Sequence, residues 1–275
     1  MHNFRKKQKR VKIILNSVLI ITAVYILAFI GAEPYIQKSL GSSLVFNYIA
    51  QLMIVVSLVF LFIYYSRFSK ADKYIENAEY IVSDCGYYLT SRPEKNISEY
   101  YKAVFDDLKS CGFHGEEKVE VNELEFDFAG FKAKEGFYIT VISEVDRNDI
   151  IAYIDSAIYD ATALKLKRKG DCVVLFICDK ADDEAIALSK NYAALGRKEQ
   201  LKFAAAICEV SSKRVYFLGN KPSVCEKLIT NYVMNCELPL KEEYKGKEKL
   251  EFQIELEKKL SDFNIKSFKE GKYNQ

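Results

Sequence analysis

The stretch that decides the fold is VVLFICDKADDEAIALSK, residues 173–190, in which an apolar run passes abruptly into a cluster of acidic residues. With Cys172 the apolar part reads CVVLFIC, and its unbroken hydrophobicity predicts a strand covered on both faces of a sheet. The acidic part opens DDEAIALSKNYAALG, which predicts a helix over residues 182–196 that ends at Gly196. A fully covered strand followed by a helix indicates an α/β domain.

Hydrophobic patterns also predict the elements before and after residues 173–196. Alternation of apolar and polar residues, with turn residues between the runs, predicts two antiparallel hairpins, one over 121–131 and 137–145, the other over 201–210 and 214–220. Helical spacing predicts helices over residues 149–170 and 221–235. The order ββαβαββα predicts a mixed, roughly five-stranded sheet with helices. Residues 249–263 fit a strand or a helix, and residues 268–275 are expected to be a frayed tail.

The first quarter of the chain is unlike the rest. Residues 13–32 and 44–65 are runs of 20 and 22 residues without a charged side chain. Each is long enough as a helix to cross a hydrocarbon core of about 30 Å, so a transmembrane hairpin is expected over residues 13–65. A cleaved signal peptide is the alternative for the first run, but that run is too long and a second span follows it.

Basic residues at the span ends predict the orientation. The N-terminus, residues 1–12, carries six basic residues, and Arg67, Lys70 and Lys73 follow the second span, while the connection over residues 33–43 has only Lys38. The positive-inside rule then places both termini in the cytoplasm and the hairpin in the plasma membrane. The bilayer is therefore the first expected partner, with a cytoplasmic α/β domain over residues 113–275.

Between the spans and that domain, residues 66–112 are expected to form a helical stalk and a second amphipathic helix that ends at Gly112. Apolar residues continue beyond the membrane at alternating steps of three and four, which is heptad spacing. One hypothesis is that this seam pairs with other copies of the chain, and its candidate oligomerisation residues are Phe68, Ala71, Ile75, Ala78, Val82 and Cys85. Because two of these are Ala and one is Cys, an amphipathic helix that packs on its own domain is preferred.

The net charge and the cysteine content argue against several classes of function, among them nucleic-acid binding and metal binding by cysteine pairs. Residues 74–275 carry a net charge of −6, which argues against a broad nucleic-acid-binding surface. All 7 cysteines follow the second span, so they are expected to be reduced thiols, and no CxxC pair is present. Cys172, Cys178 and Cys208 lie in strand-like runs and are expected in the core. Cys111 and His114 supply only half of a metal-like motif.

Carboxylates at the ends of the predicted strands are the candidate metal ligands. Ligands of open α/β sheets bind at the carboxyl edge of the strands, and this edge would carry Glu144, Asp146 and Asp179. A Mg²⁺-dependent reaction needs carboxylates that converge on one site. Helix capping explains acidic residues at such positions equally well and is the preferred interpretation, so no cofactor is predicted unless the chain is a Mg²⁺ enzyme.

No known catalytic motif is present, since GxGxxG, GxxxxGK, GxSxG and HExxH are all missing from the sequence. The preferred hypothesis is therefore a membrane-anchored cytoplasmic α/β module for binding, sensing or assembly, which forms a homo-oligomer if the spans and stalk pair. The alternatives are a membrane-tethered hydrolase that uses a divalent metal and a membrane effector gated by a small ligand.

Overall fold

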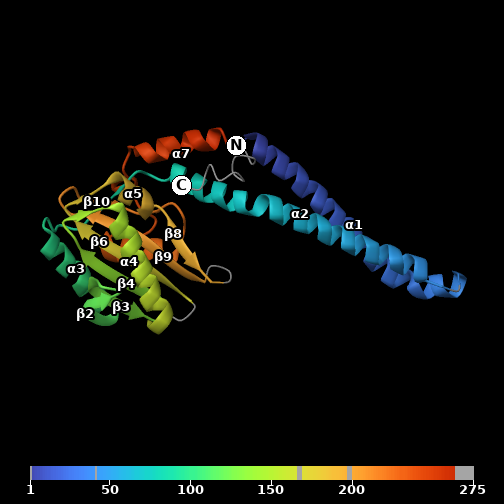
Figure 1. Ribbon diagram of the computed structural model, residues 1–275, viewed down its shortest axis with the longest axis horizontal. Helices are drawn as coiled ribbons and strands as arrows, with labels where there is room; N and C mark the ends of the chain where they lie inside the picture. The colour runs from blue at the N-terminus through green and yellow to red at the C-terminus, as the bar shows by residue number, and fades with distance from the viewer. Residues whose placement is uncertain (1, 41, 166–168, 197–199, 264–275) are drawn as a thin grey trace. The chain divides into compact units, whose positions relative to one another are not determined.

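The computed structural model describes residues 2–40, 42–165, 169–196 and 200–263, and divides the chain into two compact units. The first unit comprises residues 1–79 and 256–275, and the second comprises residues 80–255. The helices and strands of both are labelled in Figure 1. The predicted tail over residues 268–275 lies outside the described residues.

The first unit is built on two long helices, α1 (His2–Leu40) and α2 (Leu44–Ser83), and α2 continues into the second unit. The two helices run antiparallel and side by side (Figure 1), with Thr22 Oγ1 2.9 Å from Ser57 Oγ between them. The connection expected over residues 33–43 is shorter in the structure, because α1 stays helical through Pro34 to Leu40. A proline inside a helix removes one backbone hydrogen bond, and α1 continues past it here.

The second unit contains an eight-stranded mixed sheet with the strand order β1-β10-β9-β6-β4-β3-β2. The eighth strand, β8, pairs with the first residues of β9, whereas β10 pairs with its last residues. The strands are β1 (Tyr88–Leu89), β2 (His114–Val121), β3 (Leu124–Lys132), β4 (Glu135–Val141), β6 (Gly170–Cys178), β8 (Tyr192–Leu195), β9 (Leu201–Glu209) and β10 (Arg214–Tyr216). Neighbours β4, β6 and β9 are parallel, and the outer pairs are antiparallel. The α/β class and both predicted hairpins are confirmed, but the sheet is larger than the five strands expected.

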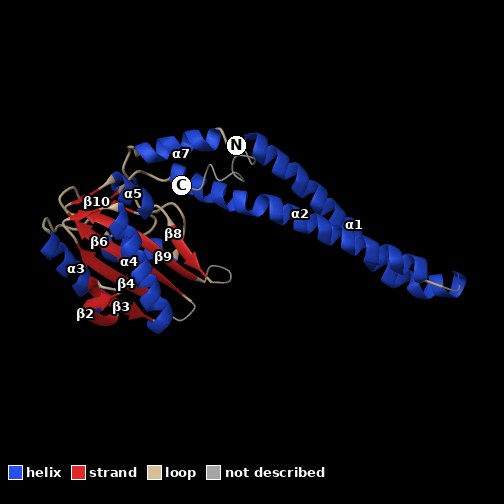
Figure 2. Cartoon of the chain, in the orientation of Figure 1, coloured by secondary structure: helices blue, strands red, loops and turns tan. Residues whose placement is uncertain are grey.

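Helices cover both faces of this sheet (Figure 2). Alternate residues of β6 face opposite ways: Val173, Leu175 and Ile177 join the core beneath α3 (Ile97–Ser110) and α6 (Val224–Leu228). Cys172, Val174, Phe176 and Cys178 join the core beneath α4 (Arg147–Asp160) and α5 (Asp183–Ser189). The prediction of a central strand covered on both faces is therefore confirmed, and Cys172, Cys178 and Cys208 are buried core thiols.

Several helices differ from their predicted bounds. The helix expected over 182–196 stops at Ser189, and Tyr192–Leu195 turn back as strand β8 along β9. α4 and α6 each pass into a short π-helix, Ala161–Lys165 and Ile229–Val233. A 3-10 turn (Glu242–Tyr244) precedes α7 (Glu251–Ser261), so the ambiguous C-terminal segment is helical.

One edge of the sheet is the charged strand β2. Its partners on β3 skip Lys118, which sits in a bulge with φ 56°, in the left-handed region that residues other than glycine rarely adopt. The Lys118 side chain lies 2.6 Å from Asp127 and 2.9 Å from Glu125 on the neighbouring strand. These two ion pairs connect the bulge to β3.

Candidate functional site

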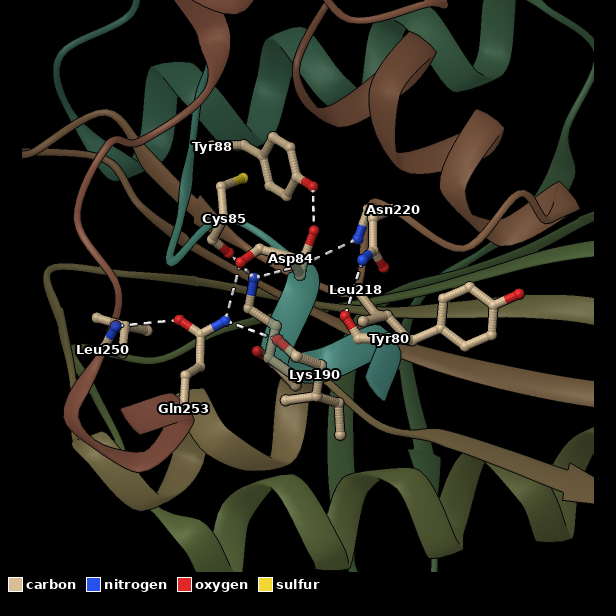
Figure 3. A network of polar contacts seen from close by, with 12 residues as sticks. Tyr80, Asp84, Cys85, Tyr88, Lys190, Leu218, Asn220, Leu250 and Gln253 are labelled. Atoms are coloured by element: carbon tan, nitrogen blue, oxygen red, sulfur yellow. Dashed lines mark hydrogen bonds and ion pairs between the residues drawn. The ribbon is translucent and has the colours of Figure 1, made fainter. Parts of the chain in front are cut away.

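The most developed cluster of polar side chains lies in the second unit, where α2 ends. We call it the α2 joint and define it by Tyr80, Asp84, Tyr88, Lys190, Asn220 and Gln253 (Figure 3). These residues come from the last turn of α2, the following strand β1, the end of α5, the loop after β10 and the first turns of α7. Segments that are far apart in the sequence therefore meet at one helix end.

An ion pair between Asp84 and Lys190 is the centre of the α2 joint. Both side chains are completely buried, and Lys190 Nζ lies 2.8 Å from Asp84 Oδ2. The ammonium group also donates to the Cys85 carbonyl oxygen at 3.0 Å and lies 5.4 Å from the centroid of the Tyr88 ring. Asp84 accepts two further hydrogen bonds, from Tyr88 Oη at 2.5 Å and from the Gly219 amide at 3.4 Å. Each charge is thus paired and hydrogen-bonded, which a buried ion pair requires.

Side chains from elsewhere in the chain cap the end of α2. The last carbonyl groups of a helix have no partner within the helix. Gln253, which is fully buried, donates to the carbonyl oxygens of Ile81 at 2.8 Å and Asp84 at 3.1 Å. Asn220 donates to the Tyr80 carbonyl oxygen at 2.8 Å. The positive charge of Lys190 beside this helix end also complements the helix dipole.

Two glycines allow the backbone to approach this closely. A Cβ atom on Gly219 would lie 2.4 Å from the Tyr88 ring, and a Cβ atom on Gly86 would lie 2.4 Å from the Glu248 carbonyl oxygen. Any side chain at either position would push apart the segments that meet at the joint. The segments of the α2 joint are therefore closely packed around the end of the helix.

The electrostatics of the α2 joint fit a structural role. Burial and the nearby Asp84 carboxylate raise the pKa of Tyr88 far above its ordinary value, and burial raises the pKa of the Cys85 thiol. Both groups therefore stay protonated and are poor nucleophiles. The Asp84 carboxylate and the Lys190 ammonium group are both hydrogen-bonded, which fits a role in fixing the helix end, whereas the buried Asn220 Oδ1 has no hydrogen-bond partner among the described residues.

The three candidate metal ligands lie on the two loops that follow β4 and β6. Glu144 begins β5 (Glu144–Val145), which pairs in parallel with β7 (Lys180–Ala181) directly after Asp179. Asp146 caps α4, and its Oδ1 accepts from the amides of Asn148 and Asp149 at 2.6 Å and 2.9 Å. Within the described ranges no group of three or more His, Cys, Asp or Glu residues is placed to hold a metal ion. The metal site therefore stays a prediction.

Several groups at the carboxyl edge of the parallel strands bond to one another. The Asp179 amide donates to the Ser143 carbonyl oxygen at 3.1 Å, and the Ala181 amide donates to Glu209 Oε1 at 3.0 Å. Tyr216 Oη and Ser212 Oγ donate to Glu209 Oε2 at 3.1 Å and 3.0 Å. Glu209 and the Asp179 backbone are thus bonded within the chain at this edge, where ligands of open α/β sheets usually bind.

A recess of about 290 Å³ lies where the first residues of β2 pair with the last residues of β3. It is lined by His114, Gly115, Glu116, Val119, Ala129, Phe131 and Asp160. Asp160 is buried and accepts a hydrogen bond from Tyr138 Oη at 2.7 Å. Of the half-motif, Cys111 caps the end of α3 and His114 begins β2.

The candidate oligomerisation seam is covered by the chain itself. Phe68, Ala71, Ile75 and Ala78 are buried within the first unit, where Arg5 of α1 bonds to Asp72 and Glu79 on either side of Ile75. Tyr74 stacks on Phe263 with 6.1 Å between ring centroids. Val82 and Cys85, which belong to the second unit, are half-buried. Pairing of copies through this seam stays a prediction, and it would require the seam to be uncovered first.

Sequence reasoning missed Asp84, Lys190 and Gln253. The signal was present in part, because Asp84 lies directly before Cys85, the last seam candidate, and a lone lysine follows α5. Nothing in a single sequence indicates that two residues 106 positions apart become partners.

Comparison with known proteins gives little further information. No protein-family model matches the sequence, and no match is found among curated proteins. Among solved structures, a repair endonuclease from Pyrococcus abyssi is similar at 12% identity with a TM-score of 0.28, covering 42% of this chain and 48% of that one. The chain thus spans about half the length of that endonuclease, and a likeness at this TM-score carries no argument about fold or activity.

Proposed function

We propose that the protein is a two-span membrane protein with a cytoplasmic α/β domain that serves as a binding, sensing or assembly module. The α2 joint fixes this domain to the end of the second helix. The observation that carries the proposal is the continuity of α2, in which one 40-residue helix contains both an apolar span and the helix end set into the joint. A helix of that length is about 60 Å long.

The surface of the hairpin supports insertion in a bilayer. Two helical segments, Gln8–Ser39 and Leu44–Ser66, are long and apolar enough to span a membrane, and only 11% of the most apolar window of each is buried. A helix in the core of a soluble domain would hide its apolar side chains. Here large apolar side chains are exposed along both helices, for example Leu27 at 70% and Phe62 at 75%. Such a surface fits contact with lipid.

The contact between the spans also suits an apolar environment. Thr22 and Ser57, both nearly buried, satisfy each other's hydroxyl groups at 2.9 Å, and Tyr25 Oη donates to the Phe46 carbonyl oxygen at 3.2 Å. Small polar residues that bond across two helices stabilise helix pairs in membranes. The basic residues at the cytoplasmic ends of the spans support an orientation with both termini inside.

Cysteine labelling tests the proposed topology. Cys111 is exposed on the α/β domain, and Ser42 is exposed in the connection between α1 and α2. In intact cells, a membrane-impermeant maleimide should label Ser42→Cys in a Cys111→Ser background but should label Cys111 only after permeabilisation. The protein should also stay with the membrane during alkaline carbonate extraction. Labelling of Cys111 in intact cells, or release of the protein by carbonate, would overturn the proposal.

A further inference from the structure

The cytoplasmic ends of the two spans carry basic side chains at one level of the hairpin. Lys9, Arg10 and Lys12 on α1 and Lys70 on α2 are all exposed. None of these four forms an ion pair with any carboxylate in the parts of the chain that the structure describes. We call these four residues the basic collar.

The register of the helix pair places the collar. Thr22 lies level with Ser57, and Arg5 lies level with Asp72. Because the helices are antiparallel, each step along α1 towards the N-terminus is matched by one step along α2 towards the C-terminus. Lys9 therefore comes level with Lys70, and Lys12 comes level with the first residues after the second apolar run. The collar borders the apolar part of both helices.

One or two helical turns further from the spans, a basic side chain is paired with carboxylates. There Arg5 lies 2.5 Å from Asp72 and 2.9 Å from Glu79, so its charge is neutralised inside the protein. By contrast, residues 8–16 and 63–71 contain no Asp or Glu at all. The positive charges next to the apolar surface are thus left unneutralised by α1 and α2, whereas the outer arginine is paired.

We propose that the basic collar binds the phosphate headgroups of anionic phospholipids in the cytoplasmic leaflet, an inference that rests on the proposed membrane insertion. Ammonium and guanidinium groups form charge-assisted hydrogen bonds with phosphate. A basic residue close to an anionic membrane surface strengthens association by about fivefold. The collar presents four such residues on two helices at one depth, so a headgroup beside the hairpin meets positive charge from either helix.

Spin-labelled lipids test this proposal on the full-length protein. The protein is reconstituted in vesicles of equal parts phosphatidylcholine and phosphatidylglycerol, and each lipid is spin-labelled in turn. Lipid in contact with inserted helices gives a motion-restricted spectral component, and its amount for the two lipids gives their relative association. We expect a preference for phosphatidylglycerol of about fivefold in wild type, because one headgroup contacts one or two collar residues at a time. Replacement of all four collar residues by Gln should bring the ratio close to one.

Two further measurements keep the result interpretable. A matched variant with four exposed lysines of the second unit changed to Gln, at Lys169, Lys180, Lys241 and Lys247, should keep the wild-type preference. In wild type, the preference should fall as salt is raised, because surface charge is screened; this measurement needs no variant that might change orientation. If neither salt nor the collar variant reduced the preference for phosphatidylglycerol, the proposal that the collar binds headgroups would be overturned. An equal reduction in the matched variant would overturn it as well. Absence of the motion-restricted component would instead overturn membrane insertion itself.

Discussion

The pair formed by Asp84 and Lys190 is the residue-level feature with the largest expected effect on stability. Lys190→Met leaves a completely buried carboxylate without its cation, and loss of one partner of such a pair typically lowers the free energy of unfolding by about 3–5 kcal/mol. We expect a loss of this size in thermal or urea unfolding of the detergent-solubilised chain. Lys241→Met, at a lysine whose side chain is 77% exposed, should change stability by less than about 0.5 kcal/mol.

The double variant separates loss of the pair from loss of packing. Asp84→Asn with Lys190→Met removes both charges, so much of the lost stability should return, as it does when buried ion pairs are replaced by neutral groups. A double variant as unstable as the two single variants added together would show that charge pairing contributes nothing at this position.

Capping of the end of α2 makes a second prediction at the residue scale. Gln253→Ala leaves the carbonyl oxygens of Ile81 and Asp84 without their side-chain donor, which should lower stability by about 1–3 kcal/mol. Amide hydrogen exchange should become faster over residues 80–86 while the amides of β6 stay protected. Glu255→Ala, at an exposed position on the same helix, is the control. Unchanged exchange over residues 80–86 would show that Gln253 does not hold the helix end.

Among the elements, the first turn of α4 allows helix capping to be distinguished from metal binding. Asp146→Ala removes the bonds to the amides of Asn148 and Asp149, and loss of such a cap should cost about 1 kcal/mol with or without Mg²⁺. Glu144→Ala, at an exposed position, should change little. If Mg²⁺ raised the unfolding temperature of wild type but of neither variant, the metal prediction would be supported instead.

The seam on α2 gives a further prediction at the level of the element. Ile75 is fully buried within one chain, so Ile75→Ala should lower the free energy of unfolding by about 2–5 kcal/mol. The molecular mass from light scattering in detergent should stay as in wild type. Ile63→Ala, at a residue 48% exposed, is the control and should change neither quantity. A fall in mass for Ile75→Ala would show that the seam joins copies of the chain.

The elements that sequence reasoning found and missed differ in physical character. The two long apolar helices, β6 and both hairpins have strong hydrophobic patterns, and the structure confirms these elements. Strand β8 was missed because its residues, YAAL, favour a helix locally, and only pairing with β9 makes them extended. Strand β2 was missed because HGEEKVEV is charged on both faces, as an edge strand allows. Long-range pairing decided both cases, and the α2 joint depends on it as well.

For the whole molecule, buried tyrosines predict loss of stability at alkaline pH. Burial raises the pKa values of Tyr101 and Tyr216 to about 12 and those of Tyr100 and Tyr138 further still. Tyrosines of the unfolded chain ionise near pH 10, so above that pH the unfolded state holds fewer protons than the folded state. Stability should therefore be complete below about pH 10 and fall steadily from there to about pH 12.

The pH dependence of unfolding checks this assignment. Tyr101→Phe removes one group whose pKa is raised, so the slope of unfolding free energy against pH should become shallower above about pH 10. Ile151→Val, at a residue 43% exposed on α4, removes no ionisable group and should leave the slope unchanged. An equal change of slope in both variants would contradict the assignment.

The bulged edge strand β2 matters for a domain anchored as proposed, because tethering confines the copies to two dimensions and raises their encounter rate. An open sheet edge invites the edges of neighbouring copies to pair with it. On β2 the left-handed backbone at Lys118 interrupts the row of free amides and carbonyls, and the adjacent carboxylates repel a second edge of the same kind. The opposite edge, β1, is only 2 residues long. The two ends of the strand order, β2 and β1, thus discourage pairing, which lowers the tendency to aggregate when copies are crowded in the membrane plane.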